Sequence, residues 1–175
     1  AAAGAAESIF LNSGQICVAG SRLYVQKSAY DDVVNRVASI ASKHVVGCSL
    51  DPATTLGPLI SRRHKGRVEA YIDAAESDGA ELISSHTVPQ QGFFVAPTIV
   101  TGAKHGAAIT QEEVFGPVLS IYPFDDEVDV LQAANGTQYG LAATVWTSSL
   151  NHAEAMIDGL ECGKVSVNSA GFPYP

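Results

Sequence analysis

Short apolar segments alternate along the whole chain with longer segments whose apolar residues recur at helical spacing, and this alternation most constrains the fold. The apolar segments cover residues 21–26, 81–84, 93–100, 117–124, 141–147 and 164–168. Strands separated by amphipathic helices favour an α/β fold, because each helix must bury its apolar stripe against a sheet. We therefore expect a layered, largely parallel sheet flanked by helices on both faces.

Polar residues that favour helix N-termini indicate where the helices begin. We expect one helix from an N-cap at Ser28 to about His44, and a second that begins after Ser61. Two further helices should be capped by Asp125 or Asp126 and by Ser148 or Ser149.

Composition narrows the range of partners. Of the 175 residues 46% are hydrophobic and 16% charged, which is enough apolar material for a core. Acidic residues outnumber basic ones by 18 to 10, giving a net charge of −8. Such a surface repels phosphate backbones and anionic lipids, so we expect neither nucleic acid nor a membrane as a partner. No apolar run approaches the ~18 residues of a transmembrane helix, and there is no GxGxxG or GxxxxGK[ST] phosphate-binding loop.

The three cysteines, Cys17, Cys48 and Cys162, are too widely spaced for a disulfide framework or a paired metal site. We therefore expect no bound metal, and a reducing cytoplasm as the location. A lone cysteine is more often an inert hydrophobe than a nucleophile, and we interpret Cys48 and Cys162 in that way. Cys17 differs because Gly14 and Gly20 bracket it, which lets a substrate carbon approach the sulfur closely. A backbone N–H at such a turn can also stabilise an oxyanion.

A second segment, QEEVFGPV at residues 111–118, places two carboxylates ahead of an aromatic residue, a Gly-Pro pair and a strand. Val114 and Phe115 need a nearby core, so Glu113 should stand on structured backbone. A basic run from Arg62 to Arg67 opens one of the helices. It is most simply a solvated face, although cations at a helix N-terminus oppose the helix dipole and hint at an anionic partner.

These segments carry a resemblance to a known family. FLNSGQICVAGSRLYV (10–25) is similar to the catalytic-cysteine segment of the aldehyde dehydrogenase superfamily, and EEVFGPVLSIYPF (112–124) resembles its second hallmark. Smaller matches follow in the family's order: GPLIS (57–61), GFFVAPTIV (92–100), YGLAATVWT (139–147) and GKVSVN (163–168). The resemblance implies that residues 1–175 are a partial, truncated catalytic domain, without the family's dinucleotide-binding domain and C-terminal segment.

By this resemblance, the chain is part of an enzyme that oxidises an aldehyde to a carboxylic acid with NAD or NADP. Cys17 matches the nucleophile, whose thiolate forms a thiohemiacetal and, after hydride passes to the cofactor, a thioester that is hydrolysed. Glu113 matches the residue that hydrogen-bonds the nicotinamide ribose, and Phe115 matches the aromatic residue that packs against the nicotinamide end. His64 and Arg67 fall where many members carry Gln and Lys near the cofactor ribose.

The resemblance also limits what this chain does alone. The family's general-base glutamate and oxyanion-hole asparagine would precede Ala1, so we expect the isolated chain to be inactive. A CoA-acylating relative, a cysteine-dependent acyl hydrolase with a His partner for Cys17, and a non-catalytic fragment remain alternatives. Ile16 and Val18 flank the cysteine and favour a hydrophobic aldehyde. Family members are oligomers and a free sheet edge promotes pairing, so we expect a homo-oligomer.

Overall fold

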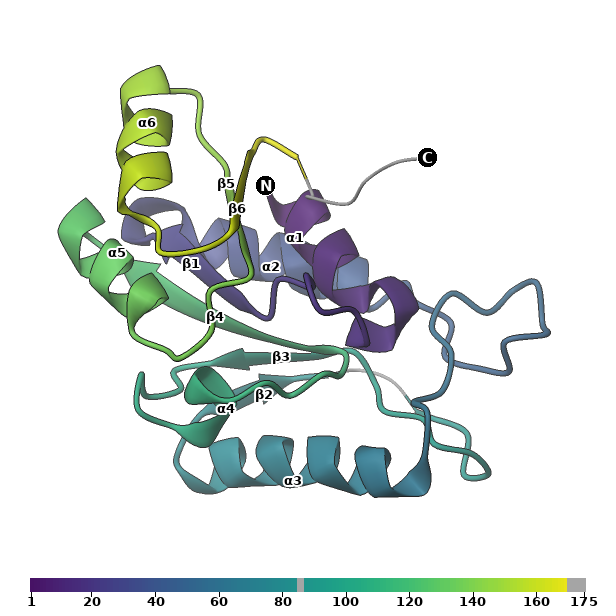
Figure 1. Ribbon diagram of the computed structural model, residues 1–175. Helices are drawn as coiled ribbons and strands as arrows, with labels where there is room; N and C mark the ends of the chain where they lie inside the picture. The colour runs from purple at the N-terminus through teal and green to yellow at the C-terminus, as the bar shows by residue number, and fades with distance from the viewer. Residues whose placement is uncertain (85–86, 170–175) are drawn as a thin grey trace.

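A four-stranded sheet lies at the centre of the computed structural model, which describes residues 1–84 and 87–169 (Figure 1). Its strand order is β1-β4-β3-β2, in which β4 pairs in parallel with β1 and β3, and β2 is antiparallel to β3. A separate parallel pair is formed by β5 and β6. The strands are β1 Arg22–Gln26, β2 Glu81–Ile83, β3 Thr98–Thr101, β4 Val118–Phe124, β5 Ala142–Val145 and β6 Lys164–Val167.

Helices cover both faces of this sheet, with α1 and α2 on one side and α3 on the other (Figure 1). The helices are α1 Ala2–Phe10, α2 Tyr30–Ala41, α3 Arg62–Ser77, α4 Ala108–Gln111, α5 Glu127–Asn135 and α6 Leu150–Gly159, with 3-10 turns at Leu11–Gly14 and Lys27–Ala29. The predicted α/β fold with a mostly parallel, helix-flanked sheet is therefore confirmed. No helix in this described part of the chain is long and apolar enough to cross a membrane.

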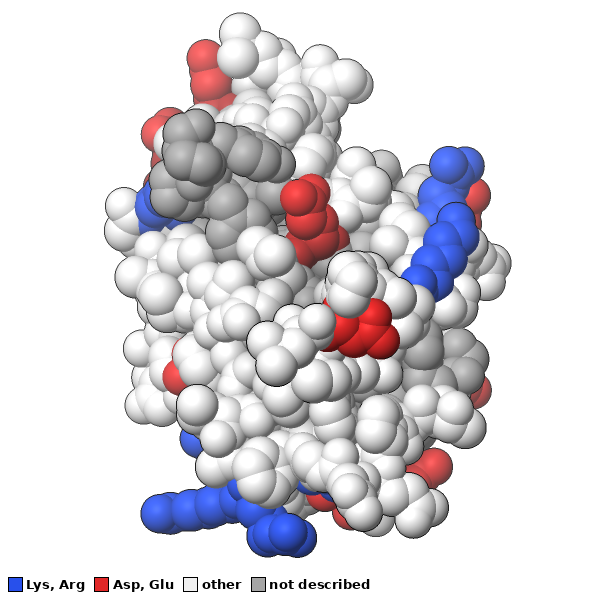
Figure 2. All heavy atoms as spheres, turned by 90° about the vertical axis from the view of Figure 1, so that its right-hand side faces the viewer, with Lys and Arg blue, Asp and Glu red and all other residues white. Residues whose placement is uncertain are grey.

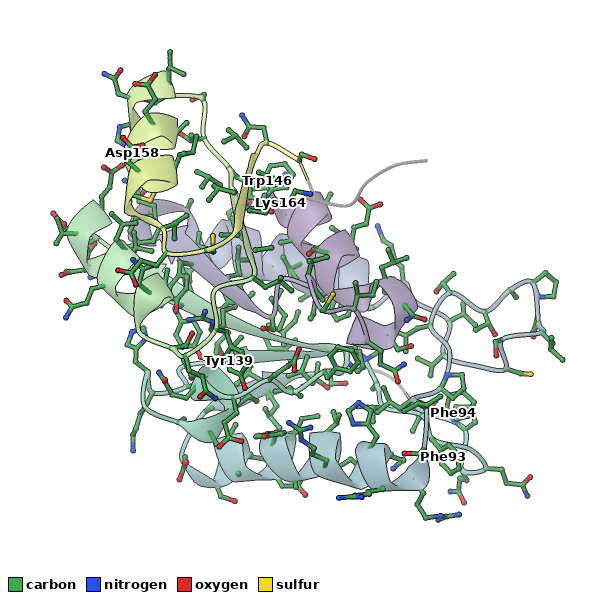
Figure 3. All side chains as sticks on the ribbon, viewed as in Figure 1. Phe93, Phe94, Tyr139, Trp146, Asp158 and Lys164 are labelled. Atoms are coloured by element: carbon green, nitrogen blue, oxygen red, sulfur yellow. The ribbon has the colours of Figure 1, made fainter. Side chains whose placement is uncertain are left out.

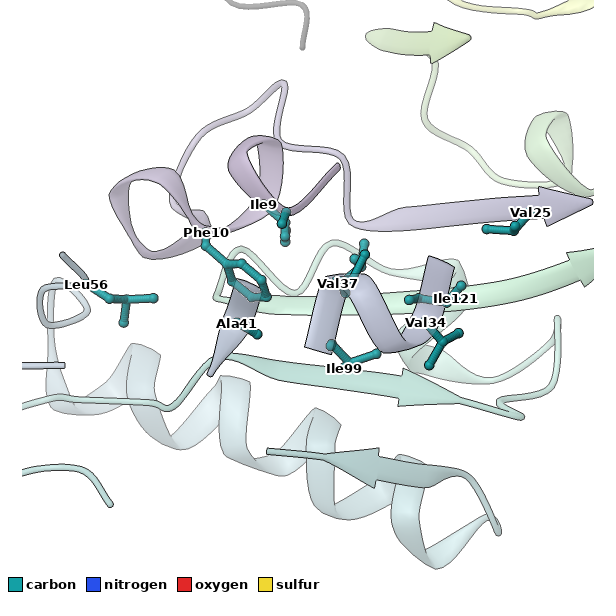
Figure 4. Close-up of a cluster of buried hydrophobic side chains, with 11 residues drawn as sticks. Ile9, Phe10, Val25, Val34, Val37, Ala41, Leu56, Ile99 and Ile121 are labelled. Carbon is teal, nitrogen blue, oxygen red and sulfur yellow. The ribbon is translucent and has the colours of Figure 1, made fainter. Parts of the chain in front are cut away.

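The core forms because alternate residues of the central strands point to opposite faces of the sheet. On β4, Leu119 and Ile121 face α1 and α2, where they pack with Phe10 and Val37 (Figure 4). Val118 points the other way, into the cluster beneath α3. Because β4 is buried along most of its length, it fixes the position of the segment that precedes it.

The structure corrects two local expectations. The helix expected from Ser28 to His44 runs from Tyr30 to Ala41, because Lys27–Ala29 forms a 3-10 turn and Ala29, not Ser28, precedes the helix. In addition, β5 and β6 do not pair with the central sheet. This pair contacts the rest of the molecule partly through Trp146, whose ring occupies the space that a side chain on Gly4 of α1 would need (Figure 3).

Candidate active site

The chain turns sharply between α1 and the segment that carries Cys17. Asn12, Ser13 and Gly14 adopt left-handed conformations in succession, with φ of 50°, 56° and 73°. Each non-glycine residue in this region is strained by roughly 1–2 kcal/mol, so other contacts must hold the turn. One of them is long-range: Ser13 Oγ donates to the Gly57 carbonyl at 2.8 Å.

Gln15 ties the same turn to the loop ahead of α3. Its Oε1 accepts from the Ile60 N–H at 2.9 Å, and its Nε2 donates to the Pro58 carbonyl at 3.5 Å. This role of Gln15 could not be predicted from the sequence, because its partners lie more than forty residues away. The amide side chain thus joins the cysteine segment to the GPLIS segment.

Cys17 lies in the open loop that follows, between Gly14 and β1, and its side chain is exposed. The Ala19 N–H donates to the Ile16 carbonyl at 2.9 Å, so the backbone curls around the cysteine. The Gly20 N–H donates to Ser8 Oγ of α1 at 2.9 Å, which anchors the far end of the loop. The sulfur is therefore accessible on a backbone that is fixed at both ends.

The other two cysteines differ from Cys17 in their surroundings. Cys48 is also exposed, so it is not the buried hydrophobe that the sequence suggested, and it lies outside the cavity described below. Cys162 is partly buried, and its thiol donates to the Lys164 carbonyl at 3.4 Å. Within residues 1–84 and 87–169, no group of three or more His, Cys, Asp or Glu residues could hold a metal ion.

The second predicted segment contacts the cysteine turn through its backbone. A side chain on Gly14 would overlap the Gly116 carbonyl and come within 2.9 Å of the Pro117 nitrogen. Only glycine leaves room for this approach and also adopts the positive φ without strain. The two segments that carry the predicted nucleophile and the predicted cofactor contacts therefore touch.

One face of α3 supports the segment from Glu112 to Gly116. His64 Nε2 donates to the Phe115 carbonyl at 2.7 Å, and their rings lie 6.1 Å apart. Gly116 packs closely against Val68. A side chain added at Gly116 would come within 2.9 Å of both valine methyl groups. His64 is itself placed by the start of the helix, where Ser61 Oγ accepts from its backbone N–H at 3.2 Å.

Further along the same face, Arg67 Nη2 donates to the Glu113 carbonyl at 2.7 Å, and Tyr71 Oη donates to the Glu112 carboxylate at 2.6 Å. The bond to Glu112 raises the pKa of Tyr71, and the bond to Tyr71 raises the pKa of Arg67. From the opposite side, the Glu113 N–H donates to the Tyr139 hydroxyl at 3.4 Å, on the loop that leads to β5 (Figure 3).

The basic run at the start of α3 is thus only partly a solvated surface. Lys65 pairs with Glu69, and the Arg62 guanidinium lies 5.8 Å from the centre of the Phe93 ring. Figure 2 shows Lys and Arg side chains at the lower edge of this face, where α3 lies, and others at its upper right, with Asp and Glu side chains near its middle. Because several of these cations have partners within the chain, the run gives little support to an anionic ligand.

A cavity of about 970 Å³ opens between β1, α5 and the β5–β6 pair. Cys17, Glu113 and Phe115 all line it, as do Ile16 and Val18. His64 and Arg67 do not line it. Their side chains bind the backbone of the segment from Glu112 to Gly116, which forms part of the cavity wall. The structure therefore places the three predicted site residues on one cavity. The two residues matched to positions near the ribose are not among the residues that line it.

A histidine partner for Cys17 would support the acyl hydrolase alternative. In the part of the chain that the structure describes, His152 of α6 is the one histidine that lines the cavity. Its Nδ1 pairs with Glu127 of α5. This pairing gives the alternative no support.

The chain is similar to known proteins in both sequence and structure. The model of the aldehyde dehydrogenase family matches residues 1–174. Phenylacetaldehyde dehydrogenase from Pseudomonas fluorescens is 45% identical over 100% of this chain and 36% of its own length. For 2-hydroxymuconic semialdehyde dehydrogenase from Pseudomonas sp. strain CF600 the identity is 41%, over 95% of this chain and 35% of that protein.

Solved structures also match nearly the whole chain. An indole-3-acetaldehyde dehydrogenase in complex with NAD⁺ gives a TM-score of 0.94 at 40% identity, over 98% of this chain and 35% of that one. Betaine aldehyde dehydrogenase from Staphylococcus aureus, also with NAD⁺, gives 0.92 at 33% identity, over 99% and 35%. The chain thus spans about a third of the length of the proteins it matches.

Proposed function

The chain belongs to the aldehyde dehydrogenase family, and on that premise we propose that it forms part of the catalytic domain of an enzyme that oxidises an aldehyde to a carboxylic acid with NAD or NADP. The observation that carries the proposal is the common cavity of Cys17, Glu113 and Phe115, together with the backbone contact between their segments at Gly14 and Gly116. The dinucleotide-binding domain and the C-terminal segment would come from other parts of the full-length protein.

In this proposal Cys17 is the nucleophile. Its thiolate attacks the aldehyde carbon, a carbon–sulfur bond forms, and the carbonyl oxygen becomes an oxyanion that the Cys17 backbone N–H can stabilise. NAD(P)⁺, when bound, supplies the acceptor for the hydride of the aldehyde carbon. The remaining thioester is attacked by water, the carbon–sulfur bond breaks, and the acid leaves while the thiolate returns.

The chemistry of the cavity wall fits the nicotinamide end of such a cofactor. The exposed carboxylate of Glu113 can accept hydrogen bonds from both hydroxyls of a ribose, and Phe115 offers an aromatic surface beside it. We propose these two residues as the cofactor contacts of this chain. The NAD⁺ complexes among the similar structures support a nicotinamide cofactor as the ligand.

We further propose a hydrophobic aldehyde as the substrate and a homo-oligomer in the cytoplasm as the working form. Ile16 and Val18 line the cavity on either side of Cys17 and offer apolar contacts. Two of the similar proteins are named for aldehydes with aromatic groups, phenylacetaldehyde and indole-3-acetaldehyde, which supports a hydrophobic substrate.

The net charge of −8 argues against a nucleic-acid partner.

The full-length protein tests the proposal directly. Incubation with NAD⁺ or NADP⁺ and a panel of aromatic and aliphatic aldehydes should increase the absorbance at 340 nm without added CoA, and the product should be the free carboxylic acid by mass spectrometry. Reduction that requires CoA and yields the acyl-CoA would instead identify an acylating relative. A folded full-length protein that reduces neither cofactor with any aldehyde would contradict the assignment.

The isolated 175-residue chain should give a different result. We expect its exposed Cys17 to react with iodoacetamide, while aldehyde-dependent reduction of NAD(P)⁺ is undetectable, because the proposed base and most of the cofactor site lie elsewhere. Mass spectrometry of the labelled peptide and a 340 nm assay measure the two properties side by side. Turnover by this chain that disappears in Cys17→Ala would refute the expectation.

A further inference from the structure

The Phe115 backbone is strained and therefore needs support. Its φ of 59° lies in the left-handed region, which a bulky residue enters at a cost of roughly 1–2 kcal/mol. The next residue, Gly116, contacts the turn at Gly14 on one side and Val68 of α3 on the other. The peptide between Phe115 and Gly116 is thus enclosed, and the direction of the Phe115 carbonyl defines its orientation.

His64 is placed to fix that orientation. Its Nε2 lies 2.7 Å from the Phe115 carbonyl oxygen, which can only accept, so this nitrogen carries the proton. The capping bond from Ser61 and the contact between the His64 and Phe115 rings hold the imidazole in place. The donor is therefore fixed before any ligand binds.

His64 acts from behind the wall. Phe115 lines the cavity, whereas His64 does not, so the imidazole influences the cavity through Phe115, by its bond to the Phe115 carbonyl and its contact with the Phe115 ring. We propose that His64 is a positioning residue that holds the Phe115 ring in the orientation that packs against the nicotinamide end of the cofactor. The inference rests on the proposed function for the identity of that ligand, and on this structure for the positioning.

A pair of variants of similar length isolates the hydrogen bond. In His64→Gln the side chain can still donate an N–H to the Phe115 carbonyl, whereas in His64→Met it cannot. Arg63→Gln is the matched control, because Arg63 is exposed on the same turn of α3 and does not line the cavity. All three are made in the full-length protein, and the melting temperature of each shows that it folds.

Two readouts are measured on each variant. Hydrogen exchange of the peptide spanning residues 112–118, without any ligand, should be faster in His64→Met than in wild type, and unchanged in His64→Gln and Arg63→Gln. The Kd for NAD⁺ by calorimetry should rise about tenfold in His64→Met, the loss expected for one hydrogen bond, and by less than about twofold in the other two. The kcat at saturating NAD⁺ should change much less than KM, because the cysteine segment is untouched.

The outcomes separate this inference from the proposed function. Equal exchange, or equal NAD⁺ affinity, in His64→Met and His64→Gln would overturn the role of His64. A wild-type protein that binds neither NAD⁺ nor NADP⁺ would refute the proposed function and the link to the cofactor. In that case the exchange of the ligand-free protein would still decide whether His64 holds Phe115.

Discussion

Replacing Cys17 with alanine in the full-length protein is expected to lower kcat for aldehyde-dependent NADH formation by about a thousandfold or more. The reason is that the carbon–sulfur bond of the proposed intermediates cannot form without the thiolate. The affinity for NAD⁺ should change little, because Glu113 and Phe115 stand on a different segment. A 340 nm assay gives the rate, and calorimetry gives the affinity.

Cys48→Ala is the matched control for that experiment. Cys48 is also exposed, but it does not line the cavity. Its variant should retain kcat within about twofold, as for a surface substitution away from the site. Comparable losses in the two variants would show that the exposure of a thiol matters and the cavity does not, which would contradict the assignment of Cys17.

The second large effect is expected from Gly14→Ala, which should destabilise the protein by about 3 kcal/mol or more. A methyl group at this position is strained at φ 73° and also overlaps the Gly116 carbonyl. The segment that carries Cys17 and the segment that carries Glu113 would have to move apart. We therefore expect both a lower melting temperature by calorimetry and a lower kcat.

Two other glycines separate the causes. Gly79 has a φ of 94° but no atom within 4 Å of an added methyl group, so Gly79→Ala should cost only about 1–2 kcal/mol of backbone strain. Gly66, inside α3, has neither constraint, so Gly66→Ala should stabilise by about 0.5–1 kcal/mol. If Gly14→Ala destabilised the protein no more than Gly79→Ala does, this would show that the two segments do not contact each other closely at Gly14.

Local signals in the sequence located most of the helices and strands. Ser61, Asp126 and Ser149 each accept a hydrogen bond from the first turn of the helix that they precede, as capping chemistry predicts. Ser28 failed as a cap because a 3-10 turn intervenes before α2. Ser28 lies inside that turn, so Ala29 is the residue that precedes the helix.

The candidate site was predictable to a similar extent. Cys17, Glu113 and Phe115 came from motifs that are continuous in the chain, and the structure places all three on one cavity. His64 and Arg67 were matched to positions near the cofactor ribose, and the structure shows that both side chains bind the backbone of the segment from Glu112 to Gly116. Which side of α3 faces that segment depends on the packing of the helix on the sheet, so alignment along the chain could not reveal it.

The sequence by itself determined the fold class, the order of the elements and the chemistry that the cavity offers. These properties depend on apolar periodicity, capping and residue type, which act between neighbours in the chain. Only the tertiary structure decided that β5 and β6 pair apart from the central sheet and that α3 supports the segment from Glu112 to Gly116. The bonds from His64 and Arg67 span 51 and 46 residues, and contacts of such range form only when packing brings distant segments together.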